Sequence, residues 1–381
     1  MSKFYVELER VVSDSYDIEI GYNLFDVLIR DLKNGLIKNV SKFAIITDSN
    51  VSEWYGNDLL KCMKNSDFDV TMFVFEANEE NKTRDTKANL EDCMIKSGFG
   101  RDSCIIALGG GVVTDLAGFL AGTYARGIPF INYATTLLAA SDASVGGKTA
   151  VDTPAATNLI GVFKQPNKVY IDIETYKTLP IREIRSGLAE TIKHACIADK
   201  SFFEYLEKNI IKVIDENGQA VLDKEVCEYI AYKNCEIKYN VIKLDDKEIN
   251  LRQILNLGHT IGRAIETLSE YKLLHGEAIS IGIVAQIIIA KKFNFVTDEE
   301  VDRVISLLKS VDLPIAIPEY IATQELVNKL YTDKKVRMNQ IRFVFQSGIG
   351  NVKRFNDGSF SKPLSENFLL EIIDEIKGKG L

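Results

Sequence analysis

The chain has 381 residues, a length that usually divides into about two domains. Hydrophobic residues make up 46% of it and charged residues 26%, which is the composition of an ordinary folded globular protein. The net charge of -8 excludes a general nucleic-acid-binding surface, which needs a basic face, but it leaves room for a local basic pocket for an anionic metabolite.

The six cysteines include no CxxC pair, and several lie inside apolar runs, so we expect buried thiols in a reducing compartment. The N-terminus lacks a basic start followed by an apolar segment. The most apolar run, residues 278–290, is shorter than the roughly 18 residues that a membrane span requires. We therefore expect a cytoplasmic protein without membrane contact.

The first half of the chain alternates strand-like runs with helical stretches. The pattern predicts a helix near residues 24–32 and a pair of strands near the N-terminus, with further strands downstream: 4–9 and 16–21, then 43–48, 70–75, 104–108, 130–135 and 169–173. Strands separated by helical stretches predict an α/β fold with a mostly parallel sheet, which binds ligands at the carboxyl ends of its strands.

Helical periodicity replaces the strand pattern after Pro180. Helices are expected at residues 201–214, 224–241, 254–268, 276–292 and 297–310, the last with a capping-box spacing at its start. These patterns predict a domain of residues 1–178 and a mainly helical domain of residues 179–381. One more strand-like run, residues 340–345, follows the basic cluster Lys334, Lys335 and Arg337, and a charge run of this kind is usually a solvated face.

Three consecutive glycines, Gly109 to Gly111, stand between an apolar strand and an amphipathic helix. Glycine lets the backbone approach a pyrophosphate closely, and a helix N-terminus presents unpaired N–H groups to the anion. Thr114 stands where the last glycine of a GxGxxG fingerprint would be, so the motif is moderately specific. Asp48, at the end of an earlier strand, suits either a ribose contact or a cap.

Residues 134–161 are dense in small and hydroxyl side chains, and they carry Asp142, Lys148 and Asn158 among glycines and threonines. A bland loop seldom needs such residues. We expect this segment to line a ligand site.

Two of the three histidines, His259 and His275, lie sixteen residues apart, on what reads as one helix, a break near residues 270–274 and the start of another helix. Both imidazoles then point to one place, which suits a metal ion with three protein ligands and an open position. The third ligand is expected from residues 187–195, where Glu190, His194 or both qualify. A lone histidine on a helix is more often a hydrogen-bonded structural residue, so spacing alone leaves the metal open.

Taken together, these segments resemble the 3-dehydroquinate synthase family and, more broadly, the sugar-phosphate cyclases. The resemblance covers nearly the whole chain, in order, through YDIEIG, GGGVVTDLAGFLAGTYARG, TTLLAASDASVGGKT, NLIGVFKQP, TLPIREIRSGLAETIKHA, LNLGHTIGRAIE, LHGEA and DKKVRMNQIRFVF. It implies a Rossmann-like N-terminal domain, a helical C-terminal domain with the site between them, and a homodimer.

The resemblance also implies roles for particular residues. Glu190, His259 and His275 would hold a zinc or cobalt ion, with His194 at a position where the family tolerates other residues. NAD would contact Asp48, Glu79, Lys82, Gly109, Gly110, Gly111, Asp115, Thr135, Thr136 and Thr178. The substrate, a sugar acid phosphate, would contact Asp142, Lys148, Asn158, Lys193, Lys238, Arg252, Asn256, a lysine of the Lys334 and Lys335 pair, and Arg126 of the neighbouring subunit.

The implied activity is that of a lyase in the shikimate pathway of aromatic amino acid biosynthesis. NAD oxidises one hydroxyl of a seven-carbon sugar acid phosphate, phosphate leaves by β-elimination, and the hydride returns before an internal aldol closes a carbocycle. The alternatives are a sister cyclase that acts on a sedoheptulose or glucose phosphate, a metal-dependent dehydrogenase of the glycerol dehydrogenase type, and a non-catalytic homologue that binds NAD or a metabolite.

Two positions depart from the family pattern: Arg263 replaces a usual histidine, and Thr157 replaces a usual lysine. Arg263 follows His259 by four residues on the predicted helix, so it is expected to face the site and to contact the substrate. The alternative is that Arg263 pairs with a nearby carboxylate such as Glu266 or Glu190.

Overall fold

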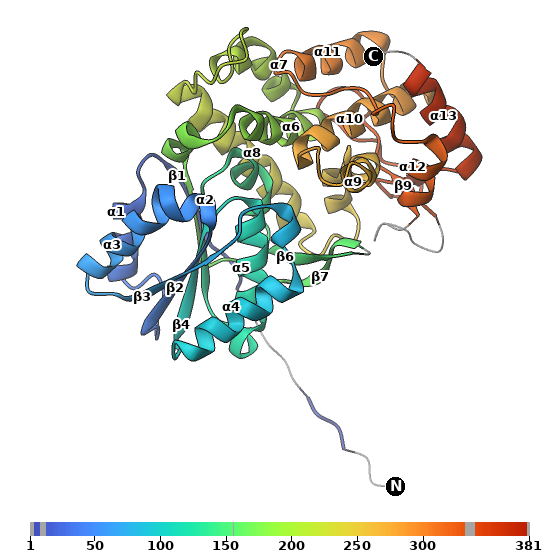
Figure 1. Ribbon diagram of the computed structural model, residues 1–381. Coiled ribbons are helices and arrows are strands. Elements are labelled where there is room, and N and C mark those ends of the chain that lie inside the picture. The colour runs from blue at the N-terminus through green and yellow to red at the C-terminus, as the bar shows by residue number, and fades with distance from the viewer. Residues whose placement is uncertain (1–3, 8–12, 155, 332–339, 379–381) are drawn as a thin grey trace.

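The protein is represented by a computed structural model that describes residues 4–7, 13–154, 156–331 and 340–378. A sheet flanked by helices forms the N-terminal half, and a group of packed helices forms the C-terminal half (Figure 1). In the described part of the chain, the N-terminal half contains β1 (Asp17–Gly21), α1 (Phe25–Lys33), β2 (Lys42–Asp48), α2 (Ser49–Val51), α3 (Asn57–Asn65), β3 (Asp69–Phe75), α4 (Arg84–Lys96), β4 (Ser103–Gly109), α5 (Gly111–Thr123), β5 (Phe130–Ala134), β6 (Lys148–Thr153), β7 (Ala156–Phe163) and β8 (Lys168–Asp172).

The main sheet has the strand order β1-β8-β5-β4-β2-β3, and every neighbouring pair is parallel. The predicted parallel α/β sheet is therefore confirmed. From β2 the chain moves outward to β3 and then returns to the other side of β2 as β4. The carboxyl ends of β2 and β4, at Asp48 and Gly109, thus flank a topological switch point, where open α/β sheets bind their ligands.

Helices cover both faces of this sheet, which explains why its central strand is apolar throughout. All seven residues of β4 are buried. On one face, Ile106 packs with Leu28 of α1 and Leu59 of α3. On the other face, Ile105 packs with Leu116 of α5.

The second half is helical, as predicted. In its described residues it contains α6 (Ile181–Ala198), α7 (Lys200–Asn209), α8 (Lys224–Leu244), α9 (His259–Leu268), α10 (His275–Lys292), α11 (Asp298–Lys309), α12 (Thr323–Leu330), the short strands β9 (Arg342–Phe343) and β10 (Lys362–Pro363), and α13 (Glu366–Gly378). The predicted capping box of α11 is present, since Glu300 N–H donates to Thr297 Oγ1 at 3.2 Å and Thr297 N–H to Glu300 Oε2 at 2.9 Å.

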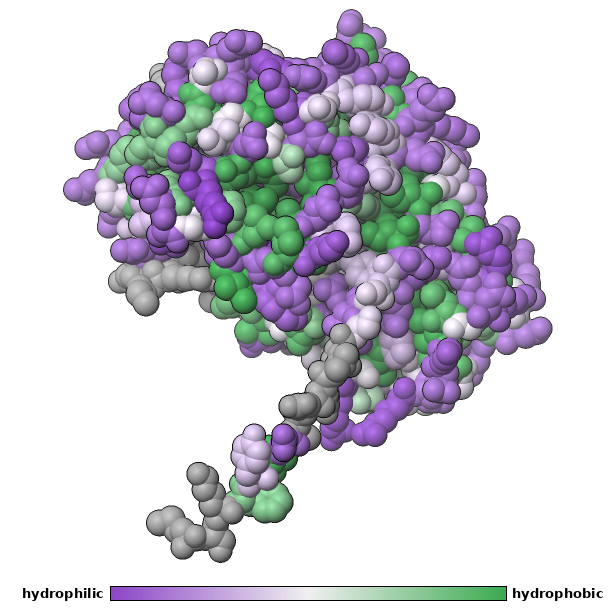
Figure 2. All heavy atoms as spheres, turned by 180° about the vertical axis from the view of Figure 1, so that it is seen from behind, coloured by the Kyte–Doolittle hydropathy of each residue, from purple (hydrophilic) through white to green (hydrophobic). Residues whose placement is uncertain are grey.

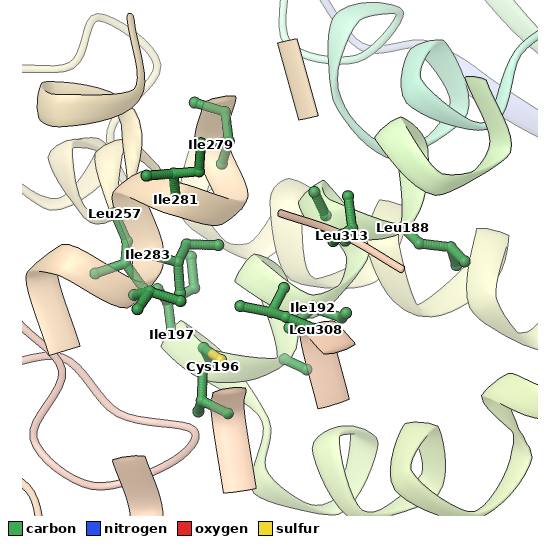
Figure 3. Close-up of a cluster of buried hydrophobic side chains, with 14 of the residues drawn as sticks. Leu188, Ile192, Cys196, Ile197, Leu257, Ile279, Ile281, Ile283, Leu308 and Leu313 are labelled. Carbon is green, nitrogen blue, oxygen red and sulfur yellow. The ribbon is translucent and has the colours of Figure 1, made fainter. Parts of the chain in front are cut away.

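One apolar core joins the C-terminal helices. Figure 3 shows Ile192 of α6 beside Leu308 of α11, and Ile283 of α10 near Leu257. Residues 278–290 are buried in this core, which accounts for their apolar character. Among the described residues, no helix is long and apolar enough to cross a membrane.

Three local predictions were wrong. Residues 4–7 form no strand and are exposed, residues 8 and 9 lie outside the described residues, and β1 pairs with β8 instead. The predicted helix 254–268 is interrupted, because residues 251–256 form a 3-10 turn and Gly258 has a left-handed φ of 78°, so that α9 begins at His259. Residues 148–163, for which only a ligand-lining role was expected, form the antiparallel hairpin β6–β7. Of the predicted strand 340–345, only β9 forms.

The outer surface adds little to the site. Figure 2 shows hydrophilic residues over most of the face opposite to that of Figure 1, with hydrophobic residues visible between them. Phe4 and Tyr5 in that segment are exposed. The described cysteines are all free thiols, and Cys104, Cys196, Cys227 and Cys235 are buried.

Candidate active site

Three side chains converge on one point between α6, α9 and α10. Glu190 Oε1 lies 3.5 Å from His259 Nε2 and 3.6 Å from His275 Nε2. The ring centroids of the two histidines are 5.3 Å apart. Two imidazole nitrogens and one carboxylate oxygen at these distances form a donor set of the kind that holds a catalytic zinc-type ion.

Close helix packing brings these three side chains together. A Cβ atom on Gly276 would lie 2.0 Å from the carbonyl oxygen of Ser186, and one on Gly282 would lie 1.9 Å from that of Gly258. Because both positions are glycines, α10 approaches α6 and the start of α9 closely. Gly276 N–H also donates to Ser186 Oγ at 3.0 Å, one turn before Glu190. This contact sets His275 beside Glu190.

Hydrogen bonds orient both imidazoles toward the shared point. His259 Nδ1 lies 3.1 Å from the carbonyl oxygen of Leu257, which can only accept, so Nδ1 carries the proton and Nε2 keeps a lone pair. His275 Nδ1 lies 3.2 Å from Glu266 Oε2. A carboxylate behind a metal-binding histidine is a common supporting contact, because it fixes the ring and raises its basicity.

The electrostatics of the cluster favour a cation. Burial lowers the pKa of His275, but the charge of Glu266, with a contribution from Glu190, outweighs burial and raises it to about 10. Burial raises the pKa of Glu190, but the Lys193 ammonium outweighs burial and lowers it to about 2. Glu190 therefore stays charged at neutral pH, and its buried Oε1 accepts no hydrogen bond from a described residue. These properties fit a divalent metal ion.

A second group, Asp142, Glu190 and His194, also lies close enough to share an ion. Two lysines neutralise this group, since Lys193 Nζ is in contact with Glu190 Oε2 and Lys238 Nζ lies 2.7 Å from Asp142 Oδ1. His194 Nδ1 faces Asn234 Oδ1 at 3.0 Å, and burial lowers the pKa of His194 to about 4. Glu190 belongs to both groups, so Lys238 on Asp142 makes the difference: its ammonium repels a further cation there, and the geometry favours the set with His259 and His275.

A cavity of about 430 Å³ opens beside the metal cluster. Its walls are rich in cationic side chains and also carry two carboxylates that pair with them: Lys148, Lys193, Lys238, Lys247, Arg252, Arg263, Arg342, Asp142 and Glu248. Arg252 is only 1% exposed, and its Nη2 donates to the carbonyl oxygen of Gly146 at 2.9 Å. A pocket lined with so many cations suits a ligand with more than one anionic group.

The edge of the main sheet forms the other side of the site. α5 begins at Gly111, and no described side chain caps its N-terminus. A Cβ atom on Gly109 would lie 2.5 Å from Val113, and one on Gly110 would lie 3.0 Å from Thr136. The glycines thus leave the backbone N–H groups open to a phosphate, which fits the pyrophosphate of a dinucleotide.

Ion pairs fix the neighbouring charges at this edge. Lys82 Nζ lies 2.9 Å from Glu79 Oε1 and 3.0 Å from Asp115 Oδ2, and Lys82 is only 3% exposed. Asp48 caps α2, because its Oδ1 accepts a hydrogen bond from Val51 N–H at 2.9 Å. The cap expected from the sequence is therefore present. Asp48 also ends β2 at the switch point, where a ribose contact was expected.

Comparison with known proteins agrees with this geometry. Residues 72–186 match the family model described as 3-dehydroquinate synthase N-terminal, and residues 187–336 match the model described as 3-dehydroquinate synthase C-terminal. The 3-dehydroquinate synthase of Ruminiclostridium cellulolyticum is 43% identical over 312 residues, which cover 82% of this chain and 85% of that one.

The chain belongs to the 3-dehydroquinate synthase family.

Solved structures of related cyclases share the fold. A 2-deoxy-scyllo-inosose synthase complexed with carbaglucose-6-phosphate, NAD+ and Co2+ is 26% identical and has a TM-score of 0.83, with 94% of this chain and 96% of that one covered. The 2-epi-5-epi-valiolone synthase of Streptomyces hygroscopicus subsp. jinggangensis, with NAD+ and Zn2+ bound, is 24% identical and has a TM-score of 0.84, with 99% and 100% covered. The family and the fold class predicted from the sequence are thus confirmed.

Most of the predicted substrate residues meet in the cavity of this synthase-family chain. Its lining includes Asp142, Lys148, Asn158, Lys193, Lys238, Arg252, Asn256 and Arg263. Arg126 is exposed and does not line the cavity of its own chain. Its predicted contact across subunits stays a prediction. Lys334 and Lys335 lie outside the described residues. The predicted nucleotide residues Thr135, Thr136 and Thr178 follow β5 and β8 at the carboxyl edge of the sheet.

Arg263 faces the cavity, as predicted. In the described part of the chain it forms no ion pair with Glu190 or Glu266, so the alternative arrangement is not observed. Thr157, the other departure from the family pattern, lies on β7 and does not line the cavity.

The sequence analysis missed Glu248. This residue lies in the segment that precedes Arg252. Its carboxylate is in contact with Lys148 Nζ and accepts a hydrogen bond from Asn256 Nδ2 at 2.6 Å. It lies in a polar run, residues 245–250, whose charges look like a solvated turn. The unusual positive φ of 58° at Glu248 is visible only in the structure.

Proposed function

We propose that this chain converts 3-deoxy-arabino-heptulosonate 7-phosphate into 3-dehydroquinate and phosphate, with NAD and a zinc or cobalt ion as cofactors. The observation that carries the proposal is a cavity with several cationic side chains on its walls that reaches His259 of the three-residue metal-binding group, Glu190, His259 and His275. The 43% identity to a synthase over most of both chains supports the particular reaction.

The cofactors would divide the chemistry between two walls of the cavity. Glu190, His259 and His275 would hold the metal, which polarises a substrate oxygen when bound. The strand ends with Asp48, Gly109 to Gly111 and Asp115 would hold NAD, which accepts a hydride and returns it within one turnover. Glu79 and Lys82 would support the nucleotide through their buried ion pair.

The chain's own side chains would bind and orient the substrate. A substrate with both a carboxylate and a phosphate needs at least two clusters of donors, and the cavity provides them: Lys148 and Asn158 on the β6–β7 hairpin, and Lys193, Lys238, Arg252, Asn256 and Arg263 on the helical side. Asp142 would hold Lys238, since the two groups are 2.7 Å apart.

Lys148 would also move a proton. Burial lowers the pKa of its ammonium to about 8, although Glu248 opposes the shift. A group that titrates near the working pH can both donate and accept a proton. Arg263 cannot do so, because a guanidinium stays protonated, and it would instead supply fixed charge and hydrogen bonds to the substrate.

The wider organisation is proposed on the same basis. A homodimer would let the exposed Arg126 of one subunit reach the substrate phosphate of the other. The division into residues 1–178 and 179–381 places the last strand of the main sheet, which ends at Asp172, in the first domain and α6 in the second. Free buried thiols such as Cys104 and Cys196 suit a cytoplasmic enzyme.

Incubation of the purified chain with NAD, Zn2+ and 3-deoxy-arabino-heptulosonate 7-phosphate tests the proposal. We expect phosphate release and carbocycle formation by NMR, without accumulation of NADH absorbance, because the same nicotinamide takes and returns the hydride. Phosphate release only with a sedoheptulose phosphate would identify a sister cyclase. Stoichiometric NADH would identify a dehydrogenase.

A further inference from the structure

Asp152 lies between the segment proposed to hold NAD and the β7 residues that line the substrate cavity. It lies on β6 and is buried, with 9% of its surface exposed. Its backbone N–H donates to the carbonyl oxygen of Lys82 at 2.7 Å. Its Oδ1 accepts a hydrogen bond from the backbone N–H of Asn158 at 2.7 Å. One residue thus connects the segment proposed to hold NAD with a residue that lines the substrate cavity.

The hairpin is irregular at this place. Val151 pairs with Ile160 and Thr153 pairs with Ala156, so that Asp152 alone stands opposite residues 157–159. Extra residues on one strand form a bulge, and bulges beside active sites re-aim side chains. Within this bulge Asn158 has a left-handed φ of 53°. Asparagine tolerates this conformation better than most residues, but it needs a partner to be held there.

We propose that Asp152 is a positioning residue whose carboxylate holds the β7 bulge so that Asn158 faces the substrate. The carboxylate replaces the ladder hydrogen bond that the bulge removes from Asn158 N–H. The backbone hydrogen bond to Lys82 holds Asp152 in place, so the position of the bulge depends on the segment proposed to bind NAD. This inference rests on the proposed function only for the identity of the substrate that Asn158 contacts.

Three single variants separate this role from a general effect on the hairpin. Asp152→Ala removes the acceptor, Asp152→Asn keeps an acceptor oxygen without the charge, and Thr153→Ala is a matched control, because Thr153 Oγ1 closes the same hairpin at 3.0 Å from the carbonyl oxygen of Ala156. We expect Asp152→Ala to raise the KM for the sugar acid phosphate by about tenfold, the loss expected for one charge-assisted hydrogen bond. Asp152→Asn should recover most of this loss, and Thr153→Ala should change KM by less than about threefold.

A double-mutant cycle with Asn158→Ala decides whether Asp152 acts through Asn158. If it does, Asp152→Ala raises KM in the parent chain but changes it little in the Asn158→Ala background. The dissociation constant of NAD, measured by calorimetry, should stay within about twofold throughout. Additive effects on KM, or a parallel loss of NAD affinity and thermal stability, would overturn the proposal.

Crystal structures provide a readout that needs no activity. Asn158 should keep a positive φ in the parent chain and in Thr153→Ala, and should leave the left-handed region in Asp152→Ala. An unchanged φ in Asp152→Ala would contradict the positioning role. A parent chain that fails to release phosphate from the heptulosonate phosphate would instead contradict the proposed function, and the crystal structures would still decide the role of Asp152.

Discussion

The two sides of the site are built on different principles. The strand-end wall comprises Asp48, Lys82, Gly109 to Gly111 and Asp115, and the helical wall comprises the site residues of α6, α8, α9 and α10. The strand-end wall offers backbone groups, and its main side-chain charges are already paired, as in the buried contacts of Lys82 with Glu79 and Asp115. On the helical side Arg263 faces the cavity, and the buried Oε1 atom of Glu190 accepts no hydrogen bond from a described residue. The strand-end side thus offers backbone N–H groups to a phosphate, whereas the helical side favours a cation at Glu190 and an anion at Arg263.

This difference implies that the walls can be disrupted separately. A change of Glu190, His259 or His275 should affect the metal and leave NAD binding intact, because these residues lie on α6, α9 and α10, whereas the glycine turn follows β4. The β6–β7 hairpin contacts both sides, since Asp152 N–H donates to the carbonyl oxygen of Lys82 and Lys148 Nζ is in contact with Glu248.

The largest expected effect is that of Glu190→Gln. A neutral amide is a weaker metal ligand than a carboxylate, and it leaves Lys193 without its partner. We expect kcat to fall by at least about a hundredfold, because a catalytic metal supplies several kcal/mol of charge stabilisation. Elemental analysis after dialysis should show metal loss, while the dissociation constant of NAD stays unchanged. A fully active variant without metal would remove the metal from the mechanism.

Glu266→Gln should have the next largest effect, on the metal alone. Glu266 supports His275 from behind at 3.2 Å, and loss of such a partner typically costs about 10–100-fold in metal affinity. Competition with a chromophoric chelator measures this loss. The matched control is Glu270→Gln, which removes the same charge from an exposed residue that pairs only with Lys272 among described residues. Equal affinities in the two variants would argue against a supporting role for Glu266.

The different construction of the walls also explains what the sequence could predict. The glycine turn and the strands around it were predictable because each depends on residues that are neighbours in the sequence. The stretch around Gly109 to Gly111 contains the strand, the turn and the start of the helix. The spacing of the histidines predicted that His259 and His275 point to one place, but it left Glu190, His194 or both as the third ligand. The contact of Lys238 with Asp142, which disfavours the set that includes His194, becomes visible only once α8 packs against residues 139–143.

Other features could not be predicted because they depend on long-range geometry. The β6–β7 hairpin lacks a strong alternating pattern, since small residues fill it where α5 packs closely: a Cβ atom on Gly118 of α5 would lie 2.3 Å from Thr149. Glu248 looked like part of a solvated turn, and only its contact with Lys148 shows that it lines the cavity.

Arg263→Ala tests the departure from the family pattern on the helical wall. Arg263 lines the cavity and forms no ion pair with the carboxylates beside it in the described chain, so it should meet the substrate. We expect KM to rise by about tenfold, the effect of one lost charge-assisted hydrogen bond, with NAD affinity unchanged. Arg263→Lys should recover part of the loss. Unchanged KM and kcat in Arg263→Ala would show that the residue is structural.

The smallest expected effect concerns pH and separates the two walls without disrupting either. Burial lowers the pKa of Lys148 to about 8, whereas the unfolded chain retains a value of about 10.5. The charged ammonium therefore lowers the stability of the folded protein at neutral pH. This loss of stability is recovered as the pH rises from about 8 to about 10.5, because the folded protein gives up the proton first. Above about pH 8 the cation is progressively lost, and anion binding weakens with it. The KM for the phosphate substrate should therefore rise severalfold between about pH 7 and about pH 9, whereas the dissociation constant of NAD should stay flat. In Lys148→Arg, which stays charged across this range, the KM profile should flatten. Superimposable profiles for the parent chain and Lys148→Arg would show that a different group controls the pH dependence.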